Sequence, residues 1–359
     1  MARPWLPSAD EVLPYLRQAD ENRWYSNFGP LLTGFEARLA GRFERATKIV
    51  TAVNGTQVLS LTLRALEAPS GALCALPAWT FVATAHAVLE AGLVPWFLDV
   101  DPATQALDPD RVREALARAP GPVGAVVVVA PYGAALDTAA WLGFREETGV
   151  PVVIDAAAGF DTTTDAALPT MVSLHATKLL GVGEGGYLAC EDTELADRVR
   201  ELTTFGFRGS RESRVPATNA KLPEHTAAVG HAALDAWPAL RLRYARTAQK
   251  LLMALASVPE VEMQPGWGLR WVSTTCVARL RSDGAARLER AATEAGVDTR
   301  RWWGGGCHTS PAFADLPREP LPVTDLLARE TLGLPFAVDM SDEAVSRVGA
   351  AAVAALVTS

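Results

Sequence analysis

Residues 124–155 read GAVVVVAPYGAALDTAAWLGFREETGVPVVID, and this stretch decides the class of the fold. It begins with a continuous valine-rich run, Gly124–Ala130, and ends with a second apolar run, Pro151–Asp155. Strands that are buried on both faces have uninterrupted apolar runs of this kind. Between the two runs, the spacing of apolar side chains predicts a helix over residues 138–147. The order strand, helix, strand predicts a parallel pair joined by a right-handed crossover.

The same alternation continues on both sides of this stretch. It predicts strands over residues 72–76, 96–100, 171–174 and 187–190, and helices over residues 81–91 and 108–118. This pattern is typical of an α/β layer with a mostly parallel central sheet between helices. Past Glu191 it gives way to a long helical stretch, 223–256, followed by a strand, 272–280, a helix, 284–295, and two closing helices. We therefore expect a large domain over residues 1–235, including an N-terminal arm over residues 1–30, and a smaller C-terminal α+β domain over residues 236–359.

Composition limits the partners that this chain can have. Its 359 residues contain 33 Lys and Arg against 41 Asp and Glu, a formal net charge of −8. An acidic chain without a basic block argues against nucleic acid or a membrane surface as the main partner. The four cysteines are scattered, which favours a reducing compartment. No signal peptide, lipidation signal or apolar run of about 20 residues is apparent. The sequence predicts a soluble cytoplasmic protein.

Several familiar site motifs are absent or lack their context. Gly181–Gly186 matches the spacing G-x-G-x-x-G, but the strand-like residues 187–190 follow it where a dinucleotide site needs a helix. The sequence has neither a P-loop nor a nucleophile elbow. Its five histidines lack metal-ligand spacing, so we expect no metal.

Two residues together suggest a site for a carbonyl cofactor. Lys178 ends the run Ser173-Leu-His-Ala-Thr-Lys178 at the exit of a predicted strand, and Asp155 ends the buried strand before it. Taken alone, Lys178 fits an ordinary solvated lysine and Asp155 fits a turn or helix cap. Together they fit a pyridoxal phosphate site, which needs an amine for a Schiff base and a carboxylate for the pyridine nitrogen.

At this point the chain resembles a known family, the DegT/DnrJ/EryC1/StrS sugar aminotransferases, which have the fold type I, aspartate-aminotransferase-like fold. The matching stretches follow the family's order along nearly the whole chain. They are Asn27-Phe-Gly-Pro30, Asn54-Gly-Thr56, Pro77-Ala-Trp-Thr-Phe-Val-Ala-Thr84, Asp99-Val-Asp101, Val153-Ile-Asp-Ala-Ala157, Ser173-Leu-His-Ala-Thr-Lys178, Gly183-Glu-Gly-Gly186, Asn219-Ala-Lys221, and Thr299-Arg300 with His308.

The resemblance implies roles for individual residues. Lys178 would hold pyridoxal 5′-phosphate as a Schiff base and move the proton at the substrate carbon, while Asp155 would pair with the ring nitrogen. During the reaction the cofactor would alternate with pyridoxamine 5′-phosphate. The residues implied in cofactor binding are Gly55, Thr56 and Ser173 at the phosphate, Phe81 on the ring, and Asp155 and Lys178.

The resemblance also implies partners. Asn219 would reach the phosphate of the neighbouring subunit's cofactor, which implies a homodimer with active sites at the subunit interface. Nucleotide sugar and glutamate would be the substrates. The residues expected to contact substrate are Asn27, Glu184, Trp303 and His308.

Some positions depart from the family's pattern. Ala158 stands where the family has a Gln or His beside the cofactor's 3-hydroxyl, and Leu174 stands where it has Phe. Ahead of His308, Trp302 and Trp303 replace the usual tyrosine region, and these indoles either stack on a nucleotide base or pack within the chain. The substrate pocket is therefore where the resemblance says least.

We expect a transaminase that moves an amino group from glutamate to a nucleotide-linked keto-deoxysugar, with C4 of a dTDP-4-keto-6-deoxyhexose favoured by the start of the chain, residues 24–30. Alternatives within the family are a cyclitol aminotransferase and a pyridoxal-phosphate-dependent sugar dehydratase, although relatives of the latter kind carry His where this chain has Lys178. An alternative of another class is a non-catalytic regulatory protein that binds the cofactor.

Overall fold

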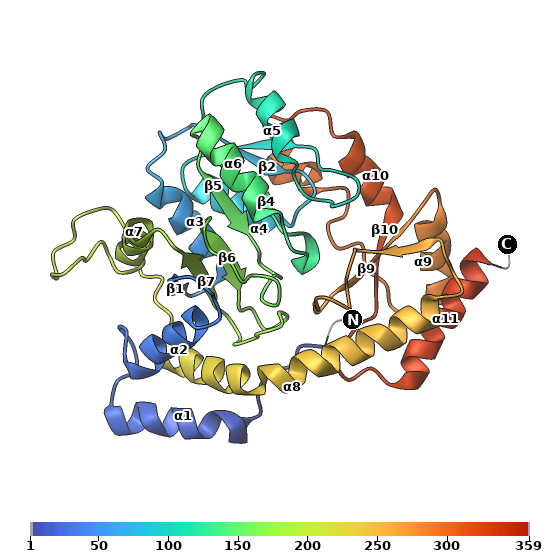
Figure 1. Ribbon diagram of the computed structural model, residues 1–359, viewed down its shortest axis with the longest axis horizontal. Coiled ribbons are helices and arrows are strands. Elements are labelled where there is room, and N and C mark those ends of the chain that lie inside the picture. Colours follow the sequence, from blue (N-terminus) through green and yellow to red (C-terminus); the bar gives the residue numbers. More distant parts are fainter. Residues whose placement is uncertain (1–2, 358–359) are drawn as a thin grey trace.

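The computed structural model describes residues 3–357, which form two sheets surrounded by helices (Figure 1). The strands are β1 (Lys48–Ala52), β2 (Leu73–Pro77), β3 (Val94–Leu98), β4 (Val123–Val129), β5 (Val152–Asp155), β6 (Thr170–Ser173), β7 (Gly186–Cys190), β8 (Val261–Met263), β9 (Cys276–Leu280) and β10 (Thr331–Leu334). The helices are α1 (Ala9–Asn22), α2 (Pro30–Ala40), α3 (Gly55–Ala65), α4 (Val82–Glu90), α5 (Pro109–Leu116), α6 (Thr138–Thr148), α7 (Thr193–Thr203), α8 (Glu224–Leu255), α9 (Gly284–Glu294), α10 (Pro322–Glu330) and α11 (Asp342–Leu356). Within the described residues, no helix has both the length and the apolar composition to cross a bilayer.

The large sheet has seven strands in the order β1-β7-β6-β5-β4-β2-β3. The five strands β3, β2, β4, β5 and β6 run parallel, while β7 pairs antiparallel with both of its neighbours. The predicted α/β fold with a mostly parallel sheet is therefore confirmed. Because the parallel strands end at one edge, the residues that follow β5 and β6 lie near each other.

Strand β4 shows why the valine-rich run belongs in the middle of this sheet. Val126 and Val128 face one hydrophobic cluster, which includes side chains of α2, α5, α6 and α8. Ala125 and Val127 face a second cluster, formed with α3, α4 and α7. Both faces of the strand are thus covered by helices, so a polar side chain has no place along it.

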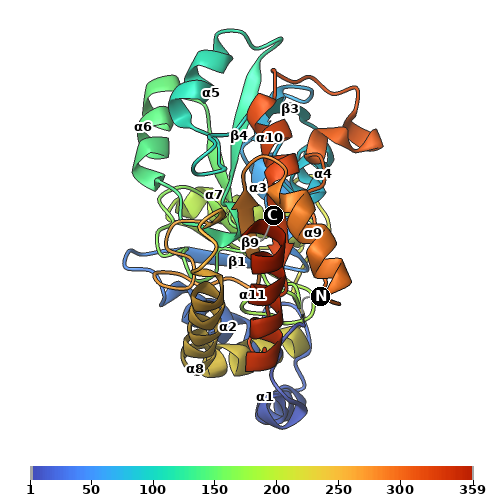
Figure 2. The same cartoon turned by 90° about the vertical axis from the view of Figure 1, so that its right-hand side faces the viewer.

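The second sheet is small and antiparallel, with the order β10-β9-β8. Helix α8 runs along the molecule from α2 towards this sheet (Figure 1). Helix α11 lies beside α8 (Figure 2). The domain boundary near residue 235 falls inside this continuous helix and stays a prediction. Residues 1–2 and 358–359 of the expected domains lie outside the described residues.

Among the elements that were not predicted from the sequence are α1, β1, β8 and β10. The expected N-terminal arm contains α1, which begins with a capping box between Ser8 and Glu11. Strand β1 pairs antiparallel with β7, and β10 lies between the two closing helices. The expected strand over residues 272–280 is shorter, because β9 starts at Cys276.

A buried glutamate fastens α2 to α8. The first-turn N–H groups of Leu31 and Leu32 donate to the two carboxylate oxygens of Glu224, at 2.8 and 3.0 Å. Gly29, the N-cap residue, has no side chain to cap the helix itself. Glu224 is 1% exposed, so water cannot replace it.

Replacing Glu224 by alanine is expected to lower the free energy of unfolding by about 2–3 kcal/mol, because two buried N–H groups lose their acceptor. Urea unfolding followed by circular dichroism measures the change, with the exposed Glu260→Ala as the control. Equal stability of the two variants would contradict this capping role.

Candidate active site

Asp155 is the last residue of β5 and is buried, with 5% of its surface exposed. Its Oδ2 atom accepts a hydrogen bond from the Thr84 hydroxyl at 2.8 Å, and its Oδ1 atom accepts one from the Ala157 N–H at 3.1 Å. Burial raises the pKa of this carboxyl group, while the two hydrogen bonds and the charge of Lys178 act in the opposite direction. The carboxylate is thus fixed in position at the carboxyl edge of the sheet.

Lys178 lies on the loop after β6, where its N–H donates to the carbonyl oxygen of His175 at 2.8 Å. Its side chain lines a cavity of about 10 Å³, which has room for about one water molecule. Burial lowers the pKa of its amine, and the charge of Asp155 opposes that shift. A lower pKa increases the share of neutral amine, which is the form that attacks a carbonyl group. The other residues that line this cavity are Arg3, Pro4, Trp5, Thr177, Tyr244, Thr274, Phe336 and Ala337.

A second cavity, of about 170 Å³, adjoins the first, because Thr274 and Phe336 line both. Arg300 and Trp302 lie on its wall, with the guanidinium carbon 4.5 Å from the centroid of the indole ring. A positively charged side chain thus lies on the wall of the cavity next to that of Lys178.

The N-terminus of α3 lies beside β6 and β7 and is a candidate anion site. Asn54 caps the helix by accepting from the Gln57 N–H at 2.8 Å. Gly55 and Thr56 lie between Asn54 and Gln57, and their N–H groups have no acceptor within the helix. Ser173 is adjacent, since a Cβ atom added to Gly55 would lie 3.2 Å from its Cβ atom. Helix N-termini of this kind bind phosphate groups.

Close backbone packing sets the shape of this anion site. Gly186 starts β7, and a Cβ atom added to it would lie 2.7 Å from both the N and the Cα atoms of Gly55. Because these neighbours are backbone atoms, the added methyl group would push the first turn of α3 away.

Gly186→Ala is therefore expected to weaken the binding of pyridoxal phosphate by about 10- to 100-fold. An absorbance titration of the apoprotein measures the dissociation constant. Gly143→Ala is the matched control, because no atom lies within 4 Å of the added methyl group in α6. A dissociation constant for Gly186→Ala within about twofold of the wild type would show that the packing does not shape the anion site.

These residues fit pyridoxal phosphate. The group needs a primary amine, a carboxylate for its ring nitrogen, an anion site and an apolar surface. Lys178, Asp155 and the N-terminus of α3 supply the first three, and the Phe81 ring, which is 55% exposed at the N-cap of α4, offers the fourth.

Three of the predicted site residues lie on the surface and do not line the Lys178 cavity. Asn27 is exposed in a left-handed backbone conformation, with φ of 61°. Glu184 is exposed with its carboxylate 3.5 Å from the Nε2 atom of His175. Asn219 is exposed and accepts a hydrogen bond from Lys221. Their functional roles stay predictions.

Trp302 and Trp303 have ring partners within the chain. Trp303 stacks on Tyr132, with ring centroids 4.1 Å apart, and meets Trp79 edge-on at 5.2 Å. Trp302 carries the Arg300 guanidinium on its ring. The sequence left two roles open for these indoles, stacking on a nucleotide base and packing within the chain. The structure provides partners for packing.

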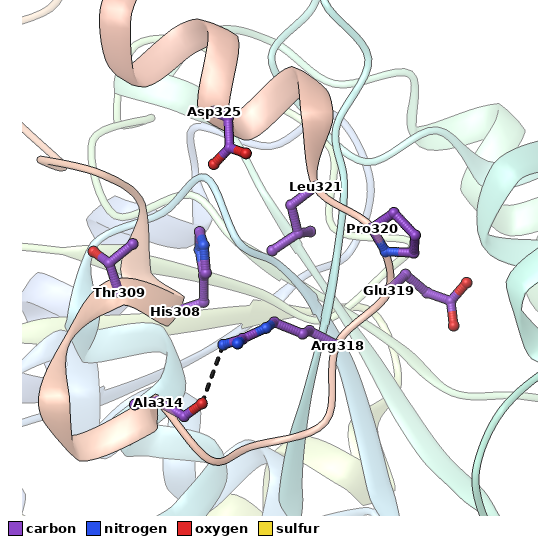
Figure 3. A pocket seen from close by; sticks show the side chains of 8 residues that line it. All are labelled: His308, Thr309, Ala314, Arg318, Glu319, Pro320, Leu321 and Asp325. Carbon is purple, nitrogen blue, oxygen red and sulfur yellow. Dashed lines mark hydrogen bonds between the residues drawn. The ribbon is translucent and has the colours of Figure 1, made fainter.

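His308 lies in a third cavity, of about 440 Å³, which shares no lining residue with the Lys178 cavity (Figure 3). Arg318 and Asp325 lie around the same space. The Nδ1 atom of His308 is buried and has no hydrogen-bond partner among residues 3–357. His308 and Lys178 therefore line different cavities, and the contact of His308 with substrate stays a prediction.

Sequence reasoning missed residues that contact the site from far along the chain. Thr84 is bonded to Asp155 across 71 positions, and Tyr244 reaches the Lys178 cavity from α8. Arg3 and Trp5 reach it from the N-terminal segment. Of these residues, only Thr84 had a signal in the sequence, because it belongs to the matched stretch Pro77–Thr84, which also contains the predicted ring contact Phe81.

Comparison with known proteins gives consistent matches over most of the chain. The sequence matches the DegT/DnrJ/EryC1/StrS aminotransferase family over residues 8–353. It is 32% identical over 337 residues to the erythromycin biosynthesis sensory transduction protein EryC1 of Saccharopolyspora erythraea, covering 90% of each chain. It is 31% identical over 340 residues to the dTDP-3-amino-3,4,6-trideoxy-alpha-D-glucose transaminase of Streptomyces venezuelae, covering 89% of this chain and 85% of the relative.

A solved structure agrees with these matches. The crystal structure of DesI in the presence of its TDP-sugar product is similar with a TM-score of 0.86 and 31% identity, covering 98% of this chain and 91% of DesI. The predicted family and the predicted cofactor are confirmed. The chain belongs to the DegT/DnrJ/EryC1/StrS aminotransferase family and is a pyridoxal-phosphate-dependent aminotransferase.

Proposed function

We propose that this protein transfers the amino group of glutamate to a keto-deoxysugar carried on a nucleotide. The observation that carries the proposal is the position of Asp155 at the end of β5 and of Lys178 on the loop after β6, the neighbouring parallel strand, so that both lie at the carboxyl edge of the sheet. When bound, pyridoxal phosphate supplies an electron sink that stabilises negative charge at the carbon losing its proton.

Each site residue of this chain would have a separate task. Lys178, which lines the small cavity, would remove the proton from the carbon that bears the amino group. Asp155 would accept a hydrogen bond from the ring nitrogen of the cofactor. Gly55, Thr56 and Ser173 would hold the phosphate.

Two guanidinium groups support an anionic donor and an anionic acceptor. Arg3 and Arg300 line the adjoining cavities at Lys178, and guanidinium groups bind carboxylates and phosphates through paired hydrogen bonds. Glutamate has two carboxylates, and a nucleotide sugar has a diphosphate.

The position that receives the amino group separates two versions of the proposal. Residues 24–30 resemble relatives that aminate C4, whereas the Streptomyces venezuelae relative is named for a 3-amino sugar. We propose C4 of a dTDP-4-keto-6-deoxyhexose as the acceptor and C3 as the alternative.

We also propose a homodimer in which Asn219 reaches the partner's cofactor, because Phe205 and Val215 on the same loop are exposed apolar side chains.

A second candidate is a regulatory protein without turnover, because the EryC1 relative is named a sensory transduction protein. The presence of both Lys178 and Asp155 favours catalysis over this candidate. Amination of a cyclitol and dehydration of a sugar are two further candidates within the family, and Lys178 counts against the dehydration.

An acceptor panel tests the proposal. The protein is incubated with pyridoxal phosphate, glutamate and either a 4-keto or a 3-keto dTDP-6-deoxyhexose, and amino-sugar products are measured by mass spectrometry. We expect product from the 4-keto sugar. Product from the 3-keto sugar alone would move the reaction to C3, and turnover of a cyclitol ketone alone would replace the sugar substrate.

A further inference from the structure

Two buried hydroxyl groups form a chain that ends on Asp155. The Thr84 Oγ1 atom lies 2.8 Å from Oδ2 of Asp155, and the Thr80 Oγ1 atom lies 2.9 Å from Oγ1 of Thr84. Thr80 and Thr84 are 2% and 1% exposed. Water therefore cannot substitute for any contact along this chain.

The directions of these hydrogen bonds follow from the donor capacity of each group. An ionised carboxylate accepts only, so the Thr84 hydroxyl must donate its single proton to Asp155. The Thr80 hydroxyl then has to donate to Thr84, and every group in the chain is satisfied. With Asp155 protonated and donating, the order would reverse and leave the Thr80 proton without an acceptor among residues 3–357. When the threonines donate in this order, Oδ2 of Asp155 is the final acceptor of the chain, which is the role that an ionised carboxylate has.

The same contacts fix the plane of the carboxylate. Oδ2 is held by the Thr84 hydroxyl and Oδ1 by the Ala157 N–H at 3.1 Å. Thr84 is itself held on the first turn of α4, two positions past Val82, and Ala157 follows β5 directly. Each carboxylate oxygen retains a lone pair, so the group can still accept a hydrogen bond from a ligand.

We propose that Thr84 and Thr80 are positioning residues that hold Asp155 as an oriented carboxylate for the ring nitrogen of the cofactor. The inference rests on the proposed role of Asp155 in cofactor binding. The oriented carboxylate would keep the ring nitrogen protonated, which is what makes the ring an electron sink. Thr80, one bond further away, would act through Thr84.

Valine has nearly the shape of threonine but lacks the hydroxyl, so Thr84→Val removes the hydrogen bond to Asp155. Oδ2 of Asp155 would then lack a partner at a buried place. Thr84→Ser keeps the hydroxyl and tests for rescue. Thr331→Val is the matched control, because Thr331 is also buried and bonded, with its hydroxyl donating to Leu327 in the small domain at 2.8 Å.

The experiment measures the ring nitrogen directly. Each variant is loaded with pyridoxal phosphate labelled with ¹⁵N in the ring, and the ¹⁵N chemical shift is recorded from pH 6 to 9. In the wild type, in Thr84→Ser and in Thr331→Val we expect the shift of a protonated nitrogen. In Thr84→Val we expect the shift to move towards that of an unprotonated nitrogen, with a smaller movement in the same direction for Thr80→Val.

Kinetics provide a second readout. A charged hydrogen bond lost from this position is expected to lower kcat of Thr84→Val by about 10- to 100-fold, while KM for glutamate changes by less than about threefold. Thr84→Ser should recover most of the rate. A protonated shift together with a kcat within about twofold of the wild type, in both valine variants, would overturn the proposal.

The outcomes separate this inference from the proposed function. The ¹⁵N signal needs only a bound cofactor, so it reports on the hydroxyl chain even if no sugar is aminated. An unprotonated ring nitrogen in the wild type would refute the role of Asp155, and with it the role of the two threonines. If Thr84→Val does not fold, Thr80→Val leaves the contact to Asp155 in place and still decides the question.

Discussion

Lys178→Ala is expected to retain the fold and lose turnover by about a thousandfold or more. The side chain has two proposed tasks, since its amine would bind the carbonyl group of the cofactor and its Nζ atom would move the proton at the substrate carbon. General acid–base catalysis alone contributes about 10²- to 10⁴-fold. No other lysine lines the cavity around Lys178, so no neighbouring amine can replace it among the described residues.

Two measurements check this prediction. Absorbance spectroscopy shows whether added pyridoxal phosphate gives the visible band of a Schiff base, and a coupled assay measures the 2-oxoglutarate released from glutamate. Lys250→Ala is the control, because Lys250 is an exposed lysine that pairs with Asp342 on the surface. Turnover by Lys178→Ala close to that of Lys250→Ala would rule out the proposed catalytic role.

Asp155→Asn is expected to give the second largest loss, with kcat lowered by about 10²-fold or more, because a neutral amide cannot hold a positive charge on the ring nitrogen. The amide presents only one acceptor, so it cannot keep the hydrogen bonds from both Thr84 and Ala157. Steady-state kinetics with glutamate measures the loss, and Asp315→Asn, at an exposed position, serves as the control.

The stability of Asp155→Asn separates loss of function from unfolding. Because burial raises the pKa of Asp155 in the folded protein, its ionisation at neutral pH opposes folding, and the opposition disappears as the pH falls below the pKa of the unfolded chain. The amide carries no charge, and this gain opposes the cost of the one hydrogen bond it loses, so we expect the apoprotein of Asp155→Asn to fold with a stability within about 2 kcal/mol of the wild type at pH 7. Reduced activity with a larger loss of stability would instead indicate a structural role.

The central sheet could be predicted because its strands carry their own signal. Val126 and Val128 contact one cluster of helices and Val127 the other, so a continuous apolar run has only one place in the fold. Strand β1 was missed although Ile49, Val50 and Thr51 are β-branched, because the run is short and its pairing partner, β7, lies about 140 positions away. Helix α1 has a signal in its capping box at Ser8 and Glu11, but Pro14 in its interior conceals the helical pattern.

In the candidate site, too, residues with a local sequence signal could be predicted, and residues whose contacts depend on the fold could not. Asp155 ends a strand and Lys178 follows one, so both could be located from local sequence together with the family resemblance. Thr84 could not be assigned, because its contact with Asp155 exists only once α4 packs against the end of β5. His308 shows the converse, since a matched motif does not say which cavity a side chain lines.

A single-turnover experiment with ¹⁵N-labelled glutamate follows the amino group from donor to acceptor. The purified protein, loaded with pyridoxal phosphate, is mixed with labelled glutamate, and then with the dTDP-4-keto-6-deoxyhexose after excess glutamate has been removed. We expect one 2-oxoglutarate per subunit with loss of the visible band, followed by return of the band and an amino sugar that carries the label. A visible band that glutamate leaves unchanged, with no 2-oxoglutarate formed, would contradict transamination from glutamate.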